Sequence, residues 1–446
     1  RETESGAHYE AEERNDADAA FLLQPEGTMA FRAVCFVARL AKGVWPLAAP
    51  RFAHPIPESS RRNRVGLNQR FLRAGVLFGC RFDVKGFIVA HSIIHPPKGR
   101  GATINLEGRF ESRVRESIDD GWDMQPDEEL PKLETTVTEE IAKSIIARNE
   151  SPDVGFSQSI NPYRGCEHGC VYCYARPTHA YLNLSPGLDF ETKLFAKVNA
   201  ADLLREELAR PGYQCDVIAL GANTDPYQPI ERELCITRQI LEVLAECEHP
   251  LGIATKSSMV ERDLDLLAPM ARKNLASVFV SITTLDHELA RRLEPRATAP
   301  LRRLQTIKRL SEAGVPCGVL VAPVIPFLTD SAVEKVLEAA REAGASMAGY
   351  VLLRLPYEVK DLFKAWLDEH YPLKASHVMS RVKDMRGGKE YDSRFDSRMR
   401  GEGEFADLLA KRFKLACQRL DFNRNRGSLD TARFRPPQRG GQMALF

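Results

Sequence analysis

Three cysteines within eight residues are the part of this sequence best suited to chemistry. Cys166, Cys170 and Cys173 stand in the stretch INPYRGCEHGCVYCYARP, at the spacing C-x3-C-x2-C. A structural zinc site takes four ligands, usually from two pairs of Cys or His. No second pair follows at such a spacing, although His168 and His179 are near enough in sequence to supply a fourth ligand. A C-x2-C redox pair would explain only Cys170 and Cys173.

An iron–sulfur cubane accounts for all three cysteines. Such clusters are held by cysteine thiolates. Three ligands on four irons leave one iron open to another molecule, much as a catalytic metal keeps one position open. The glycines in RGCEHGC allow the tight loop that this requires. The other seven cysteines are scattered among apolar residues, which predicts buried free thiols and a reducing compartment.

The elements that must position this loop form a regular alternation after residue 151. Short apolar runs rich in Val and Ile predict strands at 216–221, 251–255, 277–283, 317–324 and 349–355. Helices are predicted between them at 200–209, 233–246, 261–272, 300–313 and 330–343. With a strand just before Cys166, this makes about six βα units and a parallel sheet. Six is fewer than the eight units of a closed barrel, so the fold class is α/β with a partial barrel or an open sheet.

The flanking regions differ from this core. Residues 1–94 are predicted to form a poorly structured extension, and residues 28–57 lack acidic side chains, as transit peptides do. A segment translated ahead of the true start is the alternative. Residues 95–150 read as an extended arm, or a solvated loop, leading into a core at 151–370. Residues 371–446 read as a basic extension with one helix at 405–420, packing on the barrel.

Charge and hydropathy narrow the class of protein. The 446 residues carry a net charge of +1, so the molecule as a whole is no polyanion binder by composition. The basic tail, with Tyr391, Phe422 and Phe434 interleaved, could track a nucleic-acid backbone and stack on bases, or simply wrap the barrel. No run of about 18 apolar residues is present, which predicts no membrane span and a cytoplasmic location.

At the cysteine motif the sequence resembles the radical SAM superfamily, over about residues 151–370. It is most similar to the spore photoproduct lyase-like branch, often labelled DNA repair photolyase-related. The strings that carry this are GANTDPYQPIE, ATKSS, VSITT, LEPRAT and VAPVIP. The resemblance implies a partial (βα)6 TIM-type barrel whose Cys166, Cys170 and Cys173 hold a [4Fe-4S] cluster. It further implies that the cluster binds S-adenosyl-L-methionine (SAM), which is cleaved to a 5′-deoxyadenosyl radical by one electron from a reductase or a flavodoxin- or ferredoxin-type donor.

The resemblance also indicates which residues contact the cofactor. Tyr172 matches an aromatic residue that packs near the adenine, and Lys256 and Ser281 match positions that contact SAM. Lys256 also ends an apolar strand, where an ammonium needs an anionic partner such as a carboxylate. Glu294 and Arg296, in LEPRAT, either contact SAM or form an ion pair that holds their loop.

Two further positions are candidates for catalysis or binding. Thr224 and Asp225 follow a strand end, where barrel enzymes bind substrate or cofactor, although Asn, Asp and Pro also favour plain turns. Asp225 is the candidate catalytic residue there, and Thr224 a candidate cofactor contact. Tyr174 fits a tyrosine that relays a radical, with core packing as the alternative.

One position departs from the lyase pattern. The lyase carries a hydrogen-donating cysteine after the second strand, where Ala222 stands here, so repair of spore photoproduct by that route is in doubt. The predicted function is therefore a lyase-like radical SAM enzyme with an unidentified substrate, nucleic acid being one candidate. The alternatives are radical modification of a protein or small molecule, and a non-catalytic metal- or cluster-containing protein that binds nucleic acid. The sequence gives no indication of oligomeric state.

Overall fold

The computed structural model describes residues 99–111, 133–395, 397–424 and 427–437. The chain divides into two units, one of residues 1–25 and 91–446 and the other of residues 26–90. All described residues belong to the first unit. The predictions for residues 1–94, including the transit-peptide composition, lie outside the described residues, as does the middle of the predicted arm.

A seven-stranded sheet forms the centre of this unit, in the order β10-β9-β8-β7-β6-β3-β2. Its six parallel strands confirm the partial (βα)6 barrel, and the first of them immediately precedes the cysteine loop. Only β2 (Ile146–Arg148) runs antiparallel, at the edge beside β3. The parallel strands are β3 (Gln158–Ile160), β6 (Ile218–Leu220), β7 (Leu251–Thr255), β8 (Ala276–Ser281), β9 (Cys317–Val324) and β10 (Met347–Leu352).

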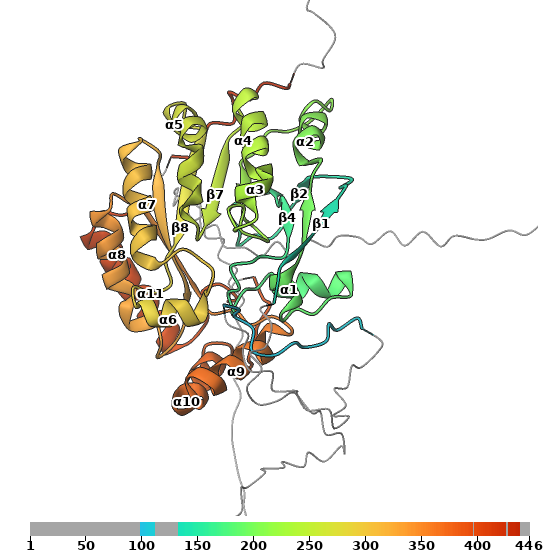
Figure 1. Cartoon of the computed structure of the whole chain (residues 1–446). Coiled ribbons are helices and arrows are strands. Elements are labelled where there is room, and N and C mark those ends of the chain that lie inside the picture. The colour runs from blue at the N-terminus through green and yellow to red at the C-terminus, as the bar shows by residue number, and fades with distance from the viewer. Residues whose placement is uncertain (1–98, 112–132, 396, 425–426, 438–446) are drawn as a thin grey trace, which may run out of the picture. The chain divides into compact units, whose positions relative to one another are not determined.

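Helices follow these strands and lie around their outer side (Figure 1). They include α2 (Ala200–Leu208), α4 (Ile236–Glu246), α5 (Leu264–Arg272), α6 (His287–Leu293), α7 (Pro300–Glu312) and α8 (Val333–Glu342). The helix predicted at 233–246 is in fact two, because Cys235 adopts a left-handed φ of 53° between α3 (Glu231–Leu234) and α4. The α-helix predicted at 261–272 begins only at Leu264, because residues 258–263 form the 3-10 helix η2 (Ser258–Asp263). A similar turn, η3 (Asp330–Ala332), precedes α8.

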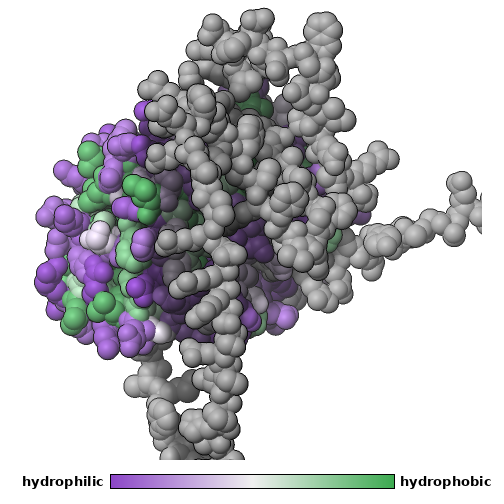
Figure 2. Space-filling model, turned by 90° about the horizontal axis from the view of Figure 1, so that it is seen from below, coloured by the Kyte–Doolittle hydropathy of each residue, from purple (hydrophilic) through white to green (hydrophobic). Residues whose placement is uncertain are grey.

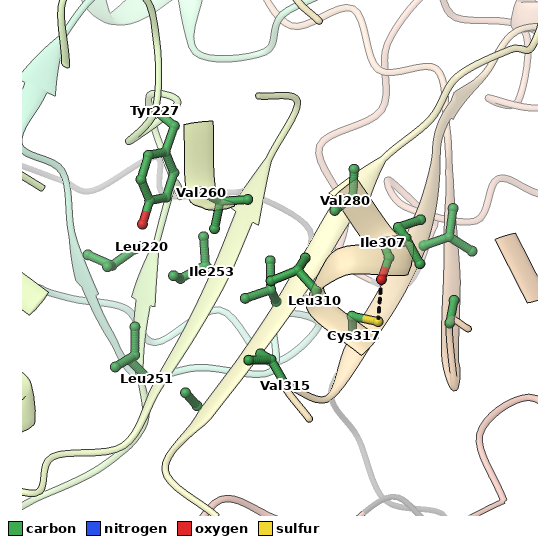
Figure 3. Packing of buried hydrophobic residues seen from close by; sticks show 14 of the residues in the cluster. Leu220, Tyr227, Leu251, Ile253, Val260, Val280, Ile307, Leu310, Val315 and Cys317 are labelled. Atoms are coloured by element: carbon green, nitrogen blue, oxygen red, sulfur yellow. Dashed lines mark hydrogen bonds between the residues drawn. The ribbon is translucent and has the colours of Figure 1, made fainter. Parts of the chain in front are cut away.

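The core lies between the sheet and these helices. Figure 3 shows Leu220, Ile253 and Val280, from neighbouring strands, packed in one layer with Ile307 and Leu310 of α7. All five are fully buried. Because helices cover the outer face, these strands are apolar along nearly their whole length, which is why they were recognisable as buried parallel strands.

The scattered cysteines agree only in part with their prediction as buried thiols. Cys247, Cys317 and Cys417 are buried, and the Cys317 thiol donates to the Ile307 carbonyl at 3.6 Å. Cys215, in the irregular segment before β6, and Cys235, between α3 and α4, are only half-buried. Cys35 and Cys80 lie outside the described residues.

A second, three-stranded sheet lies next to the cysteine loop. Its order is β1-β5-β4, with β1 (Thr136–Glu140), β5 (Lys193–Lys197) and β4 (Tyr163–Arg164). The loop leaves this sheet at the end of β4 and returns to it through η1 (Arg176–Leu182) and α1 (Asp189–Thr192). This sheet, which fixes both ends of the loop, was not predicted from the sequence.

The C-terminal region wraps the barrel. It holds α9 (Val359–His370), α10 (Pro372–Asp384) and α11 (Glu404–Arg419), so the tail has a second helix beyond the one predicted. Arg412 of α11 pairs with Glu334 of α8 at 2.7 Å. Seen from the end where α9 and α10 lie, the uncovered surface carries hydrophobic residues scattered among hydrophilic ones (Figure 2). The described helices include none with the length and apolar character of a membrane span.

The last described segment, 427–437, crosses the amino ends of the strands, opposite the cysteine loop. Arg435 donates its backbone N–H to the Cys247 carbonyl at 2.9 Å. The Phe434 ring packs against His249 and Tyr213, with centroids 5.2 and 5.3 Å away, and Phe422 is buried. These two phenylalanines therefore serve packing, and the structure does not offer them for base stacking. The predicted domain boundaries at 151 and 371 stay predictions.

Two buried histidines make stability depend on pH. Burial lowers the pKa of His179 and of His249 to about 4 each. The unfolded chain, with histidine near pKa 6.5, binds more protons, so stability should be lost as pH falls from about 6.5 to about 4. At pH 5 each histidine should cost about 2 kcal/mol. Denaturant titrations at pH 7.5 and 5 should show this loss, and His249→Gln should reduce it by about half; an unchanged pH profile would contradict the assignment.

Candidate functional site: a cysteine loop over a buried cavity

The three motif cysteines line one cavity. Cys166, Cys170 and Cys173 face a space of about 140 Å³ at the carboxyl ends of the parallel strands. Cys166 and Cys170 are buried and Cys173 is half-buried. In a βα barrel this is the end that carries the chemistry. The structure thus brings together the three thiols that the motif placed close in sequence.

These thiols need a cation if they are to ionise together. Burial raises the pKa of the Cys166 thiol well above its usual range, and Asp225 and the two neighbouring thiols raise it further. Burial likewise raises the pKa of Cys170 to about 12. A positively charged iron–sulfur unit would offset the charge of three thiolates, so the donor set fits a [4Fe-4S] cluster. Within the described ranges, no three His, Cys, Asp or Glu side chains are arranged to hold a single metal ion.

An arm from far upstream lies against the cysteine loop. A Cβ on Gly101 would lie 1.6 Å from the carbonyl oxygen of Gly169, which is the residue just before Cys170. Gly169 itself has a left-handed φ of 66°. Ala102 is fully buried beside it. The segment predicted as a solvated arm is therefore packed at this point, because only a residue without a side chain can approach the loop so closely.

A buried ion pair fastens this contact. Glu191 accepts the backbone N–H groups of Gly101 and Ala102, at 2.9 Å each, and pairs with Arg176 at 2.5 Å. Arg176 in turn donates to the carbonyl of Cys170 at 2.8 Å. Both charged side chains are fully buried. Arm, ion pair and cysteine loop thus form one connected unit.

Asp225 lies next to the cysteine loop, and both oxygens of its carboxylate have hydrogen-bond partners. It accepts from Thr255 Oγ1 at 2.7 Å and from the Lys256 backbone N–H at 2.8 Å, and its Oδ2 lies 3.3 Å from His168 Nδ1. Burial opposes its charge, but these partners outweigh that and lower its pKa to about 2. Asp225 is therefore an ionised carboxylate that connects the second strand, the third strand and the loop.

Thr224 forms a hydrogen bond with the first part of the cysteine loop. Its Oγ1 donates to the Gly165 carbonyl at 2.7 Å, and Gln228 donates to the same carbonyl at 3.2 Å. Gly165 immediately precedes Cys166. Thr224 also lines the cavity.

Lys256 and Ser281 line the cavity, as the resemblance implied. Burial opposes the ammonium of Lys256, but Cys170 and Glu294 outweigh this and raise its pKa, so the side chain is charged. Within the described part of the chain this ammonium has no ion-pair or hydrogen-bond partner; it lies 5.8 Å from the centroid of the Tyr172 ring. The Oδ1 atom of Asn223, which also lines the cavity, is buried and lacks a partner among the described residues. The cavity thus offers a ligand both the positive charge of Lys256 and the hydrogen-bond acceptor of Asn223.

Glu294 and Arg296 lie elsewhere. Glu294 is buried behind the loop, where it accepts hydrogen bonds from Tyr172 and from Thr283 at 2.7 Å and pairs with Arg303. Arg296 pairs with Glu167 at 2.9 Å on the outer side of the loop. Neither lines the cavity. Each residue thus forms an ion pair with a partner outside LEPRAT, and contact of either with SAM stays a prediction. The Glu294 carboxylate also orients Tyr172, which does line the cavity.

Tyr174 stands at the far side of the cavity. Its hydroxyl donates to the carbonyl of Ala222 at 2.5 Å, and Arg354 lies 5.6 Å from its ring centroid. Ala222 is fully buried. Outside the motif, no described cysteine lines the cavity. His179, weighed as a zinc ligand, instead bonds the Lys193 carbonyl at 2.9 Å, away from the cavity.

Several residues of the site were not predicted from the sequence. His168 was considered only as a metal ligand, and Arg354 was not considered, although an arginine at the carboxyl end of the sixth strand is a usable signal. Glu191, Arg176 and Arg303 carry buried charges whose partners are remote or irregularly spaced in sequence, so no local pattern marked them.

Comparison with known proteins shows which family this chain resembles. The model of the radical SAM superfamily matches residues 160–340. An uncharacterized protein of Mycobacterium tuberculosis (strain H37Rv) is 39% identical over 255 residues, which cover 56% of this chain and 73% of that protein. An uncharacterized protein of Methanocaldococcus jannaschii is 30% identical over 220 residues, covering 49% and 78%.

Among solved structures, spore photoproduct lyase complexed with dinucleoside spore photoproduct has a TM-score of 0.46 and 14% identity, over 64% of this chain and 79% of that one. The matched family region contains the three cysteines and four of the six parallel strands whole. This chain belongs to the radical SAM superfamily of enzymes.

Proposed function

We propose that this enzyme holds a [4Fe-4S] cluster through Cys166, Cys170 and Cys173 and uses it to cleave SAM. When bound, the cluster and SAM would supply a 5′-deoxyadenosyl radical that removes a hydrogen atom from a substrate at the barrel mouth. One observation carries the proposal: the three thiols share their cavity with a lysine ammonium that has no carboxylate within ion-pair distance among the described residues. An electron donor of the reductase, flavodoxin or ferredoxin type would complete the system.

The cavity residues have separate roles in this proposal. Lys256 pairs with the carboxylate of SAM, and Ser281 donates a hydrogen bond to the carboxylate or the ribose. Tyr172, held by Glu294, presents a fixed ring to the adenine. Thr224 and Asp225 position the loop by the hydrogen bonds described above; with a pKa of about 2, Asp225 is unsuited to donating a proton.

The substrate is proposed to be a nucleic acid, acted on by lyase-like chemistry. Ala222 occupies the position of the hydrogen-donating cysteine, so the reaction does not return a hydrogen atom from that loop. Tyr174, next to it, is the proposed radical relay. Modification of a peptide or small molecule is the alternative that the same cavity would serve.

SAM cleavage is the test of this function. The protein, reconstituted anaerobically with iron and sulfide, should be brown and should form 5′-deoxyadenosine when given dithionite and SAM. A fully loaded sample that forms none would reject the proposal. A colourless zinc protein that binds nucleic acid regardless of SAM would instead support the non-catalytic alternative.

Replacing Lys256 should weaken SAM binding. Lys256→Met removes one member of a buried charge pair, a change that typically costs at least about 2 kcal/mol, so the KM for SAM should rise about 30-fold or more. The value of kcat at saturating SAM should change less. Lys335, exposed on α8, is the matched control, and Lys335→Met should leave KM unchanged. An unaltered KM in Lys256→Met would remove Lys256 from the SAM site.

A further inference from the structure

A second cavity adjoins the cluster cavity and shares Tyr174 and Arg354 with it. Its volume is about 220 Å³. Five aromatic rings line it, from Tyr174, Tyr181, Tyr357, Tyr391 and Phe395. We call this cavity the aromatic vestibule. Its walls come from η1, from the loop before α9, and from the C-terminal region, so most of it lies outside the part matched by the family model.

Three of the five rings of the vestibule are largely exposed, and the other two are half-buried. Tyr181 is 56% exposed, Tyr357 51% and Phe395 46%, and the neighbouring Phe110 is 52% exposed. Phe110 and Tyr181 lie with their centroids 5.1 Å apart. Rings that pack a core are buried, as Phe422 is, whereas a group of exposed rings around a hollow marks an interaction site.

Arginines stand among these rings. The guanidinium of Arg109 lies 4.3 Å from the Tyr357 ring centroid and 5.1 Å from that of Tyr181. Arg398 lies 4.5 Å from the Phe395 ring, and Arg354 faces Tyr174. All three arginines line the vestibule.

Two of these arginines have carboxylate partners. Arg109 pairs with Glu358 at 3.1 Å and Arg398 with Asp153 at 2.5 Å. Neither carboxylate lines the vestibule. The wall therefore presents guanidinium groups and aromatic faces together. Stacking rings combined with arginine are the usual means of holding unpaired bases and their backbone. Several ring faces interleaved with guanidinium groups match the alternating bases and phosphates of an unpaired strand, which favours nucleic acid over a peptide.

We propose that the aromatic vestibule binds single-stranded nucleic acid. Unpaired bases stack on Tyr357 and Tyr181, the backbone phosphates lie near Arg109 and Arg398, and the strand leads past Tyr174 into the cluster cavity. The use of this site in catalysis rests on the proposed function; the binding itself does not.

Fluorescence anisotropy with two labelled twelve-nucleotide probes, oligo-dT and oligo-U, tests the proposal. The wild-type enzyme should bind at least one probe, and more weakly as salt rises. Tyr357→Leu and Tyr181→Leu should each weaken binding by about 5- to 150-fold, the usual effect of losing one stacked base. Phe327→Leu is the matched control, because Phe327 is 44% exposed but lines neither cavity, and it should bind as the wild type does.

The outcomes separate this proposal from the function. No binding of either probe, or leucine variants that bind as well as the wild type, would overturn the vestibule. The two substitutions lie in different segments, so the test still works if one variant fails to fold. Circular dichroism would reveal such a misfolded variant. SAM cleavage by the wild type without any probe is measured in parallel. If SAM is cleaved but no probe binds, nucleic-acid binding by the vestibule is rejected and the proposed function stands. If probes bind in the vestibule but SAM is never cleaved, the proposed function is rejected and nucleic-acid binding by the vestibule stands.

Discussion

Cys170→Ser should abolish cluster assembly and with it the formation of 5′-deoxyadenosine. Removing even an outer-shell partner of a metal ligand commonly costs 10- to 100-fold in affinity or activity, so loss of a ligand itself should lower the rate by at least ~100-fold. Iron and sulfide analysis, the visible spectrum and product chromatography measure this directly.

Cys317→Ser is the control for this change. Cys317 is equally inaccessible, at 2% exposed, but its thiol bonds the Ile307 carbonyl within the core. A serine there keeps a donor of similar size, so the variant should stay brown and active. If Cys170→Ser retained both the iron and wild-type product formation, the proposed ligand set would be wrong.

Glu191→Ala should be the most destabilising single change away from the cysteines. It leaves the Arg176 guanidinium buried without its carboxylate and strips the acceptor from two backbone N–H groups of the arm. Removing one partner of a buried pair costs about 3–5 kcal/mol, so the free energy of unfolding should fall by about that amount. Because Arg176 also holds the Cys170 carbonyl, cluster content should fall in the same variant.

A surface ion pair provides the comparison. Arg205 and Glu246 form a pair in which both side chains are about half exposed. Glu246→Ala should change the free energy of unfolding by no more than about 1 kcal/mol and leave cluster content intact. Equal effects of the two substitutions, measured by denaturant titration and iron analysis, would mean that the buried pair does not fasten the loop.

The sequence was sufficient where the structural signal is local. The C-x3-C-x2-C spacing predicted three thiols at one place, and all three line a single cavity. The strands β7 and β9 begin and end at their predicted residues because both are uninterrupted apolar runs. Thr224, Lys256 and Ser281 line the cavity because each lies at or shortly after the carboxyl end of a strand, the end of a βα barrel that carries the chemistry. The predicted contacts of Glu294 and Arg296 with SAM stay predictions; the string LEPRAT does not indicate which way its side chains point, and neither residue lines the cavity.

Contacts between segments far apart in the chain could not be predicted from the sequence. The pairing of β1 with β5 joins segments more than fifty residues apart, and neither strand is strongly apolar. The contact of Gly101 with Gly169 depends on a missing side chain, which leaves no periodic mark. Phe434 and Tyr391 looked alike in a basic tail, yet one packs at the amino end of the barrel and the other lines the vestibule.

The seating of Gly101 on the cysteine loop has a consequence for how the enzyme matures. The arm is synthesised first, but its partner Glu191 follows 90 residues later, so the arm must wait for the loop and α1 before it can dock. Contacts of such sequence separation form late and slowly. Iron delivered before docking would meet a loop still open on one side. Assembly of the proposed cluster would thus be timed by closure of the polypeptide around it.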